Sequence, residues 1–259
     1  MLTPYSPSLT KYETIHQAYR GLLIRVLYEY EHASSPRGLR ILEKMNTGFF
    51  VTNPVSEPTV TRDPERNVVI QRYFKAECEL YDSMTNSAED FTKASRFWKT
   101  IANPDGTINS AYGYLIWQCP SLGNVKFNPN MLTPWEWAMS SLKKDIDTRQ
   151  AILPFVRPDH FWAGNKDVVC TLHAAFHIRD MRLSMTTIMR SNDLVKGLVY
   201  DLPWFVHLMD RAVEELSPVY PGLKKGTYTH MGHSVHIYEK DIEVVKRMIG
   251  THATFSEEA

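Results

Sequence analysis

The chain has 259 residues, 43% of them hydrophobic and 12% aromatic, a composition typical of a globular protein with one or at most two domains. Its 29 Lys and Arg balance its 29 Asp and Glu, which argues against a nucleic acid or an anionic membrane as the partner and favours a small molecule. Because the chain has neither an apolar run of roughly 18 to 20 residues nor a signal-peptide pattern, we expect a cytoplasmic protein.

The first half of the chain predicts mainly helices. Apolar residues at helical spacing predict a first helix over about 12–31, namely Ile15, Tyr19, Leu22, Val26 and Tyr30. A loop, one strand around 47–51 and another loop are expected over 33–66, followed by helices over 67–83 and 88–102. The capping pattern Thr133-Pro134-Trp135-Glu136 begins a further helix that runs to about residue 145.

The second half predicts a sheet and then mixed elements. Strands are expected over 150–157, 167–179 and 182–190, with Arg179-Asp180-Met181 as a hairpin turn. A helix over 200–216, a strand over 226–238 and a short helix over 240–249 that Gly250 stops follow. Since strands and helices do not alternate regularly and no repeat or linker is found, we expect an α+β fold, with residues 1–259 as a single domain.

Three cysteines are present, Cys78, Cys119 and Cys170. They are too few and too scattered for a disulfide framework or a Cys-x-x-Cys zinc site, so each is expected to be a free thiol. A single cysteine in an apolar context is usually a packing residue, but Cys170 is followed about twenty residues later by Arg190-Ser191. Together with Arg149, these residues could hold a phosphate, and the guanidinium charges would favour the Cys170 thiolate.

A longer series of residues extends this pairing. Cys170 precedes Arg190-Ser191-Asn192-Asp193, Gly197 and Asp201, and further on comes His236-Ile-Tyr238. This order resembles the thymidylate synthase superfamily, and upstream Glu77, Trp98 and Tyr112-Gly113 match the catalytic glutamate, the folate-side tryptophan and the tyrosine-glycine pair of that family. The resemblance covers about residues 67–240.

The resemblance implies a mixed β-sheet packed with helices, with one sheet face forming a homodimer interface. It implies catalytic roles for Cys170, Glu77, Tyr112 and Asp201. It implies nucleotide binding by Arg149, Arg190, Ser191, Asp193, Asp201, His236 and Tyr238, and folate binding by Trp98, Asp193 and Gly197. Arg149 would reach the site of the other subunit.

Departures from the usual family pattern narrow the expected reaction. Val-Cys170-Thr replaces the Pro-Cys-His of most thymidylate synthases and, like Met-Arg-Ser-Asn-Asp, resembles the deoxycytidylate hydroxymethylases. Asp201 stands where uracil-reading members carry an amide, and its carboxylate suits the N4 donor of cytosine. Arg149-Gln150 replaces two consecutive arginines, so one phosphate contact changes from charged to neutral.

We therefore expect conversion of dCMP or CMP to the 5-hydroxymethyl nucleotide with 5,10-methylenetetrahydrofolate, through a covalent adduct between Cys170 and C6 of the ring. Glu77 would order the attacking water with help from Tyr112. The alternatives are a thymidylate synthase, a cytidylate C5-methylase, or a non-catalytic nucleotide-binding relative, against which the intact Cys170 and Glu77 argue. The resemblance implies a homodimer in the cytoplasm of a bacterium or a phage-infected bacterium.

Two groups of histidines raise the possibility of a metal site, one formed by His230, His233 and His236 and one by His173 and His177. On a strand, His233 would point away from the other two members of its group. No glutamate follows His173 to complete a His-Glu-x-x-His motif. We therefore expect no metal.

Overall fold

The computed structural model describes residues 9–118 and 131–251 of the chain. Its centre is an open mixed sheet with strand order β1-β3-β8-β6-β5-β4, with β2 paired to β3 and β7 to β8. The strands are β1 (Thr10–Tyr12), β2 (His32–Ser34), β3 (Ile41–Val51), β4 (Ile152–Pro154), β5 (Thr171–Arg179), β6 (Arg182–Met189), β7 (Asn192–Asp193) and β8 (Lys224–Tyr238). The predicted α+β class is thereby confirmed.

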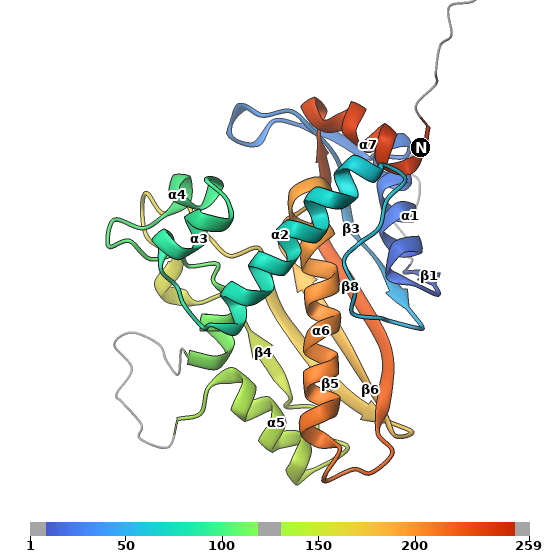
Figure 1. Ribbon diagram of the computed structural model, residues 1–259, viewed down its shortest axis with the longest axis vertical. Coiled ribbons are helices and arrows are strands. Elements are labelled where there is room, and N and C mark those ends of the chain that lie inside the picture. The colour runs from blue at the N-terminus through green and yellow to red at the C-terminus, as the bar shows by residue number, and fades with distance from the viewer. Residues whose placement is uncertain (1–8, 119–130, 252–259) are drawn as a thin grey trace, which may run out of the picture.

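Helices lie against one face of this sheet (Figure 1). The α-helices are α1 (Ile15–Tyr28), α2 (Pro64–Asp82), α3 (Ala88–Ala94), α4 (Phe97–Ile101), α5 (Pro134–Lys144), α6 (Val199–Leu216) and α7 (Ile242–Ile249). Short turns of 3₁₀-helix are η1 (Pro36–Gly38), η3 (Pro158–His160) and η5 (Glu239–Asp241), and π-helical turns are η2 (Tyr114–Gln118) and η4 (Leu194–Leu198). Over the described ranges, no helix combines the length and the apolar character that crossing a membrane requires.

Several local predictions are confirmed. Thr133 and Glu136 form the expected capping box at the start of α5. Asp180 and Met181 both have positive φ angles, 50° and 54°, and make the tight turn between β5 and β6. Gly250 ends α7 in the left-handed conformation, with φ of 79°.

Other boundaries differ from the predictions. The expected helix over 88–102 is broken, because Ser95 is extended (φ −153°, ψ 132°) and its hydroxyl accepts from the Phe97 amide. The expected helix over 12–31 begins only at Ile15, since residues 10–12 pair with β3 as strand β1. In 150–157 only β4 forms, an edge strand that ends at Pro154, which has no amide hydrogen to donate.

The region 33–66 holds more sheet than predicted. The single strand expected near 47–51 is the end of β3, which has 11 residues and pairs antiparallel with β8 from Ile41 to Val51. Ahead of it, β2 adds a short antiparallel partner. Local pattern could not predict this length, because the partner strand lies far away in the sequence.

The core lies between α6 and the sheet. Trp204 and Phe205 on α6 are buried and pack against Tyr112 and Phe155, with ring centroids 5.1–6.3 Å apart within this group. These large rings fix the start of α6 relative to the segments before η2 and β5. Tyr112 lies before η2, Cys170 lies directly before β5, and Asp201 lies in the first turn of α6.

Candidate active site

The β5–β6 hairpin brings Cys170 and Arg190 together, as their spacing predicts. Cys170 comes directly before β5, and Arg190 comes directly after β6. The Arg190 amide donates to the Cys170 carbonyl at 2.8 Å, and Arg190 Nη2 lies 3.8 Å from Cys170 Sγ. A guanidinium group therefore lies beside the candidate nucleophile.

Two opposing effects act on the Cys170 thiol, and the expected one, from Arg190, is the smaller. Arg190 does lower the pKa of Cys170, but burial outweighs this effect and raises that pKa to about 11. Arg190 also donates from Nε to the Val169 carbonyl at 3.1 Å and from Nη2 to the Val168 carbonyl, which holds the guanidinium in place. In the absence of substrate the thiol is thus protonated at neutral pH.

Asp201 lies in the first turn of α6, hydrogen-bonded to Tyr112. Burial raises the pKa of Asp201 to about 7, although a hydrogen bond with Tyr112 opposes this rise. The Tyr112 hydroxyl in turn accepts from Thr171 Oγ1 at 2.8 Å. Tyr112 therefore links the residue after Cys170 to the candidate base-reading carboxyl.

Glu77 lies on α2 and is buried, at 7% exposure. Burial first, and then the charge of Asp201, raise the pKa of Glu77 to about 8. Tyr73 donates to Glu77 Oε1 at 3.2 Å, and Trp98 Nε1 donates to the Tyr73 hydroxyl at 2.9 Å. The predicted glutamate and the predicted folate-side tryptophan are thus joined by one intervening tyrosine, which the sequence analysis did not identify.

Asp193 and Gly197 shape the turn between β7 and α6. Asp193 Oδ1 accepts from the amides of Val195 at 2.8 Å and Lys196 at 3.1 Å, so this carboxyl caps η4. A Cβ atom on Gly197 would lie 3.3 Å from Asp201 Oδ2, a tight contact that favours glycine here.

His236 and Tyr238 share one face at the end of β8, as predicted, and their rings meet edge to face at 5.4 Å. In the pairing of β7 with β8, Asp193 lies opposite His236. Ser191 is partly buried and comes directly before β7. The structure thus brings these predicted nucleotide-binding residues to one end of the sheet.

Arg149 is not part of this cluster within the chain. It is exposed in the turn after α5, and no hydrogen bond or ion pair described for residues 9–118 and 131–251 joins it to Cys170 or Arg190. The prediction that Arg149 binds the nucleotide therefore needs a second subunit and stays a prediction.

Arg37 belongs near the site, although the sequence analysis missed it. It lies in η1 with a φ angle of 53°, and its positive charge lowers the pKa of Tyr238, which burial raises overall. The only signal in the sequence is the turn Ser34-Ser35-Pro36-Arg37-Gly38, which predicts a loop but not the position of its arginine. Lys196 and Lys240 also lie over the Tyr238 ring, at 5.8 and 5.3 Å from its centroid.

The histidines have separate partners. His230 is buried and bonds to Tyr228 and Asn192, whereas His233 is exposed and bonds to Asn46. Within the described ranges, no three His, Cys, Asp or Glu side chains gather as metal ligands would. Cys78 and Cys170 are free thiols, and Cys119 lies outside the described residues.

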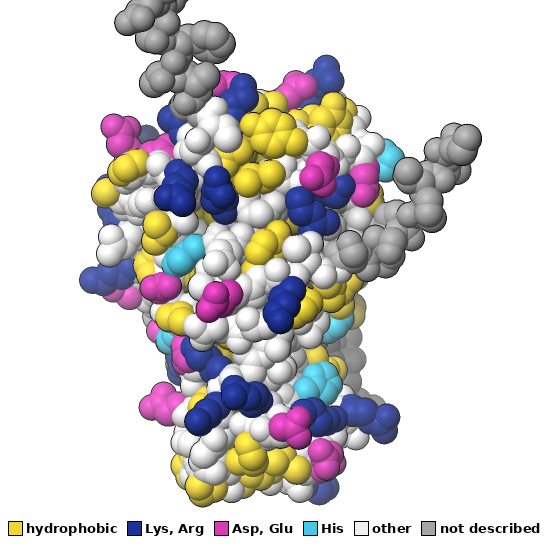
Figure 2. Space-filling view, turned by 90° about the vertical axis from the view of Figure 1, so that its right-hand side faces the viewer, with side chains coloured by type: hydrophobic (Ala, Val, Ile, Leu, Met, Phe, Trp, Pro, Cys, Tyr) yellow, Lys and Arg dark blue, Asp and Glu magenta, His cyan; other side chains and the backbone are white. Residues whose placement is uncertain are grey.

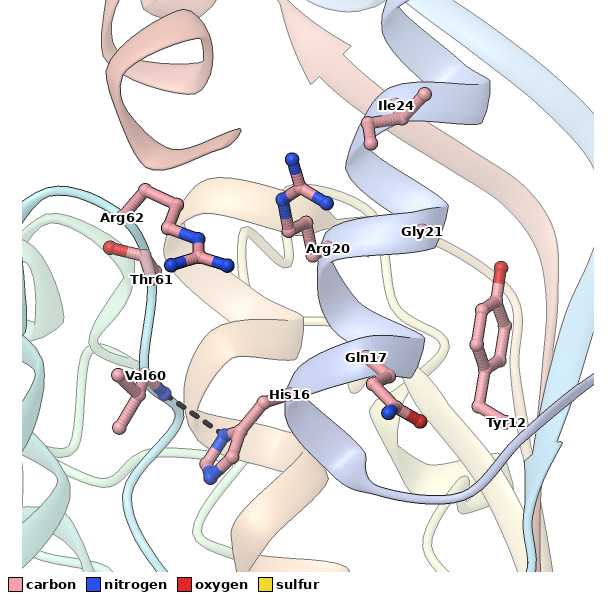
Figure 3. A pocket seen from close by; sticks show the side chains of 9 residues that line it. All are labelled: Tyr12, His16, Gln17, Arg20, Gly21, Ile24, Val60, Thr61 and Arg62. Carbon is pink, nitrogen blue, oxygen red and sulfur yellow. Dashed lines mark hydrogen bonds between the residues drawn. The ribbon is translucent and has the colours of Figure 1, made fainter. Parts of the chain in front are cut away.

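A surface cavity of about 490 Å³ lies apart from these residues (Figure 3). It lies between α1 and the segment 60–62, where His16 Nδ1 accepts from the Val60 amide at 3.1 Å. None of its lining residues is a predicted site residue. On the face shown in Figure 2, basic and acidic side chains are interspersed, in keeping with the neutral net charge.

The chain is similar in sequence to several known proteins. The family model described as Thymidylate synthase matches residues 58–256. Deoxycytidylate 5-hydroxymethyltransferase of Enterobacteria phage T6 is 27% identical over 180 residues, which cover 67% of this chain and 69% of that protein. Deoxyuridylate hydroxymethyltransferase of Bacillus phage SP01 is 27% identical over 231 residues, 87% of this chain and 57% of that protein. A thymidylate synthase of Clostridium beijerinckii is 20% identical over 171 residues, 64% of this chain and 57% of that protein.

Proposed function

Since the chain belongs to the thymidylate synthase family, we propose that it is a folate-dependent transferase that hydroxymethylates C5 of a cytosine nucleotide, dCMP or CMP. The position of the Asp201 carboxyl is the observation that supports cytosine as the base. This carboxyl is hydrogen-bonded to Tyr112 and lies close enough to Cys170 for its charge to raise the pKa of that thiol, so the ring of a nucleotide attacked at C6 would lie within its reach. The similarity to the phage deoxycytidylate enzyme supports the proposal.

Cys170 begins the reaction. Its sulfur forms a bond to C6 of the pyrimidine, and the electron pair of the C5–C6 double bond makes C5 nucleophilic. Because burial raises the pKa of this thiol to about 11, the thiolate needs stabilisation, and Arg190 Nη2 at 3.8 Å supplies positive charge beside the sulfur. C5 would then bond to the one-carbon unit, and the C5 proton and tetrahydrofolate would leave. Water would add to the resulting exocyclic methylene, and the bond between Cys170 and C6 would break to release the product.

Asp201 reads the base and activates it. Its carboxylate accepts a hydrogen bond from the N4 amino group of cytosine, and a pKa of about 7 suits sharing a proton with N3. Protonation at N3 draws electrons from the ring and makes C6 more electrophilic, so base recognition and addition of Cys170 are coupled.

Glu77 handles protons at the one-carbon unit. With a pKa raised to about 8, it holds a proton at neutral pH and can donate it, and only after losing that proton can it accept one from water. We assign it the ordering of the water that completes the hydroxymethyl group, with Tyr112 assisting. The Tyr73 hydroxyl fixes its orientation.

The one-carbon donor is 5,10-methylenetetrahydrofolate, which supplies the carbon when bound. The folate has a flat ring system, which packs well on aromatic side chains. Trp98 packs edge to face against Phe97, and Phe97 is 58% exposed and therefore accessible to such a ring. We assign Trp98, Asp193 and Gly197 to this side of the site. Trp98 connects it to Glu77 through Tyr73.

The phosphate of the nucleotide would lie among Arg190, Ser191 and Arg37, with His236 and Tyr238 on the sugar. Arg149 would come from a second subunit, since in its own chain it is exposed and apart from Cys170. The homodimer would form through the sheet face opposite the helices (Figure 1). The whole of residues 1–259 would then act as one catalytic domain.

One observation favours hydroxymethylation of dUMP as the second candidate. A carboxyl with a pKa of about 7 is partly protonated at neutral pH, and a protonated Asp201 would donate to the O4 acceptor of uracil. The similarity to the phage deoxyuridylate enzyme agrees with this alternative.

In the deciding experiment, the protein is incubated with methylenetetrahydrofolate and either dCMP, CMP or dUMP. The mass of the nucleotide product is then measured by mass spectrometry. The proposal expects a gain of CH₂O on dCMP or CMP. A gain of CH₂ would assign methylation instead, and a product from dUMP alone would replace cytosine by uracil. No mass change with any nucleotide would overturn the assignment of an enzyme.

A further inference from the structure

Three buried side chains form a hydrogen-bond chain that the proposed reaction does not use. The Tyr228 hydroxyl and His230 Nδ1 are 2.9 Å apart, and His230 Nε2 and Asn192 Oδ1 are 3.0 Å apart. Tyr228 and His230 are both 0% exposed, and Asn192 is 1% exposed. These hydrogen bonds connect the centre of β8 with β7, which directly precedes the turn that carries Gly197.

The direction of these hydrogen bonds follows from the chemistry of the groups. Burial lowers the pKa of His230 to about 3, so the ring is neutral and carries a single N–H. The oxygen of an amide only accepts, so that hydrogen is on Nε2 and Nδ1 accepts from Tyr228. The Asn192 amide is therefore held with Nδ2 turned away from His230.

Asn192 Nδ2 has no hydrogen-bond partner among the described residues, although it is buried. Leaving a buried donor unsatisfied costs about 1–3 kcal/mol, so such an atom usually has a partner. Gly197, which has no side chain, lies next to this amide. A Cβ there would lie 3.7 Å from Asn192 Nδ2 and 3.3 Å from Asp201 Oδ2, so both polar atoms border the same notch.

We propose that Asn192 is a positioning residue for Asp201 and that its amide donates to the Asp201 carboxylate through one water molecule held in the notch beside Gly197. Asn192 Nδ2 and Asp201 Oδ2 both face the Cβ position of Gly197, and a single bound water bridges two such polar atoms at about 2.7–3.2 Å from each. The inference deepens the proposed function and rests on Asp201 as the reader of the base. The bridging water favours the ionised carboxylate and fixes which of its oxygens faces the nucleotide.

Other titratable groups interact electrostatically with Asp201, and a test of Asn192 must leave them unchanged. They are Glu77 and Tyr81 of α2, Tyr112 before η2, Cys170 before β5, Asp193 before η4, and Tyr228 of β8. None of them needs to be altered to remove the Asn192 donor or to fill the notch.

The test is a titration of the Asp201 carboxyl by ¹³C NMR in the protein without nucleotide, with the signal assigned by its loss in Asp201→Asn. Asn192→Leu keeps the volume of the side chain but removes the donor, so the inflection should move to higher pH by about one unit. Gly197→Ala fills the notch while Asn192 is intact and should move the inflection the same way. Thr59→Val is the matched control, since Thr59 is buried and its hydroxyl also lacks a partner among the described residues.

A second readout is the ratio of kcat/KM for the cytosine nucleotide to that for the uracil nucleotide. Asn192→Leu should lower this ratio about three- to tenfold, which a general loss of stability in Thr59→Val would not do. If Asn192→Leu does not fold, His230→Phe replaces it in the test. This variant keeps the stacking on Phe49 but removes the hydrogen bond that orients the Asn192 amide, so the Asp201 inflection should again move to higher pH.

Unchanged inflections in Asn192→Leu and Gly197→Ala would overturn the proposal, even if the protein hydroxymethylates dCMP. A shifted inflection without any turnover of a nucleotide would support the link between Asn192 and Asp201 and would remove only the role in reading the base.

Discussion

The charge of Asp201 raises the pKa of Glu77, so these two carboxyl groups, which come from α6 and α2, lie in one poorly solvated site. Burial raises the pKa of Asp201 to about 7 and that of Glu77 to about 8. Two such neighbours do not both ionise at neutral pH, because the first charge opposes the second. At least one proton is therefore stored beside Cys170 before any substrate arrives.

The first prediction concerns stability against pH. Because the folded pKa of Glu77, about 8, lies above its ordinary value of 4.5, the folded protein holds more protons than the unfolded chain between these values. The stabilising contribution is complete below pH 4.5 and is lost as the pH rises through about 8. Between pH 6 and pH 9 the melting temperature of the wild type should fall by several degrees, and Glu77→Gln should fall much less.

Asp90→Asn is the control for this measurement. Asp90 is a surface carboxylate whose pKa is lowered, chiefly by its hydrogen bond with Lys93, so it is ionised throughout that range. Differential scanning calorimetry should give the same slope for Asp90→Asn as for the wild type. An equal slope in Glu77→Gln would show that Glu77 does not hold the proton.

The second prediction is that Cys170→Ala abolishes turnover while binding of the nucleotide stays measurable by calorimetry. The reason is that Cys170 provides the covalent bond to C6, whereas the phosphate and sugar contacts come from other residues. Cys78→Ala is the matched control, because Cys78 is also a free thiol, with a pKa raised to about 12, and should keep most of the activity. Substantial turnover by Cys170→Ala would end the covalent mechanism.

The third prediction is that Asp201→Asn weakens the preference for cytosine and admits uracil nucleotides. A mismatched hydrogen bond in such a site is worth about 1 to 3 kcal/mol, which is roughly one to two decades in the ratio of kcat/KM values. Asp210→Asn on the same helix is the control, since Asp210 is paired with Lys225 and is not assigned to the site. If the ratio is the same in Asp201→Asn and in the wild type, another residue reads the base.

The fourth prediction concerns the shared site. Mixing Cys170→Ala chains with Arg149→Glu chains should restore activity, because one of the two sites in each heterodimer then contains both Cys170 and Arg149. Recovery could reach about half of the wild-type activity per heterodimer, with subunit exchange verified by two different tags. Arg179→Glu alone should keep its activity, since Arg179 lies near the same turn, beside Asp147, without an assigned role. Inactive heterodimers would place Arg149 outside the partner's site.

Spacing predicted the pairing of Cys170 with Arg190 because a tight turn at Asp180 and Met181 fixes the register of the hairpin between them. The mixed sheet and the helical cover also followed from local pattern and from the family resemblance. The effect of Arg190 on the Cys170 thiol agrees in direction with the prediction, whereas the larger, opposing effect of burial could not be read from the sequence.

Contacts between segments that are far apart along the chain could not be predicted from the sequence. Asn192 meets His230 only because β7 pairs with β8, and Arg37 approaches Tyr238 only because β3 pairs with β8. The register of such long-range pairings is set by the packed core and not by neighbouring residues. Tyr73 was missed for a simpler reason, since a tyrosine on the partly buried face of a helix is usually a packing residue.

The central position of β8 has a consequence for biosynthesis. β3 and β6 both hydrogen-bond to β8, which comprises residues 224–238, so neither strand has this neighbour until those residues have left the ribosome. Earlier segments can form helices and the β5–β6 hairpin during translation, but the two parts of the sheet stay separate. Because β8 also carries His236 and lies beside Asp193, the proposed nucleotide site cannot form before β8 has been synthesised.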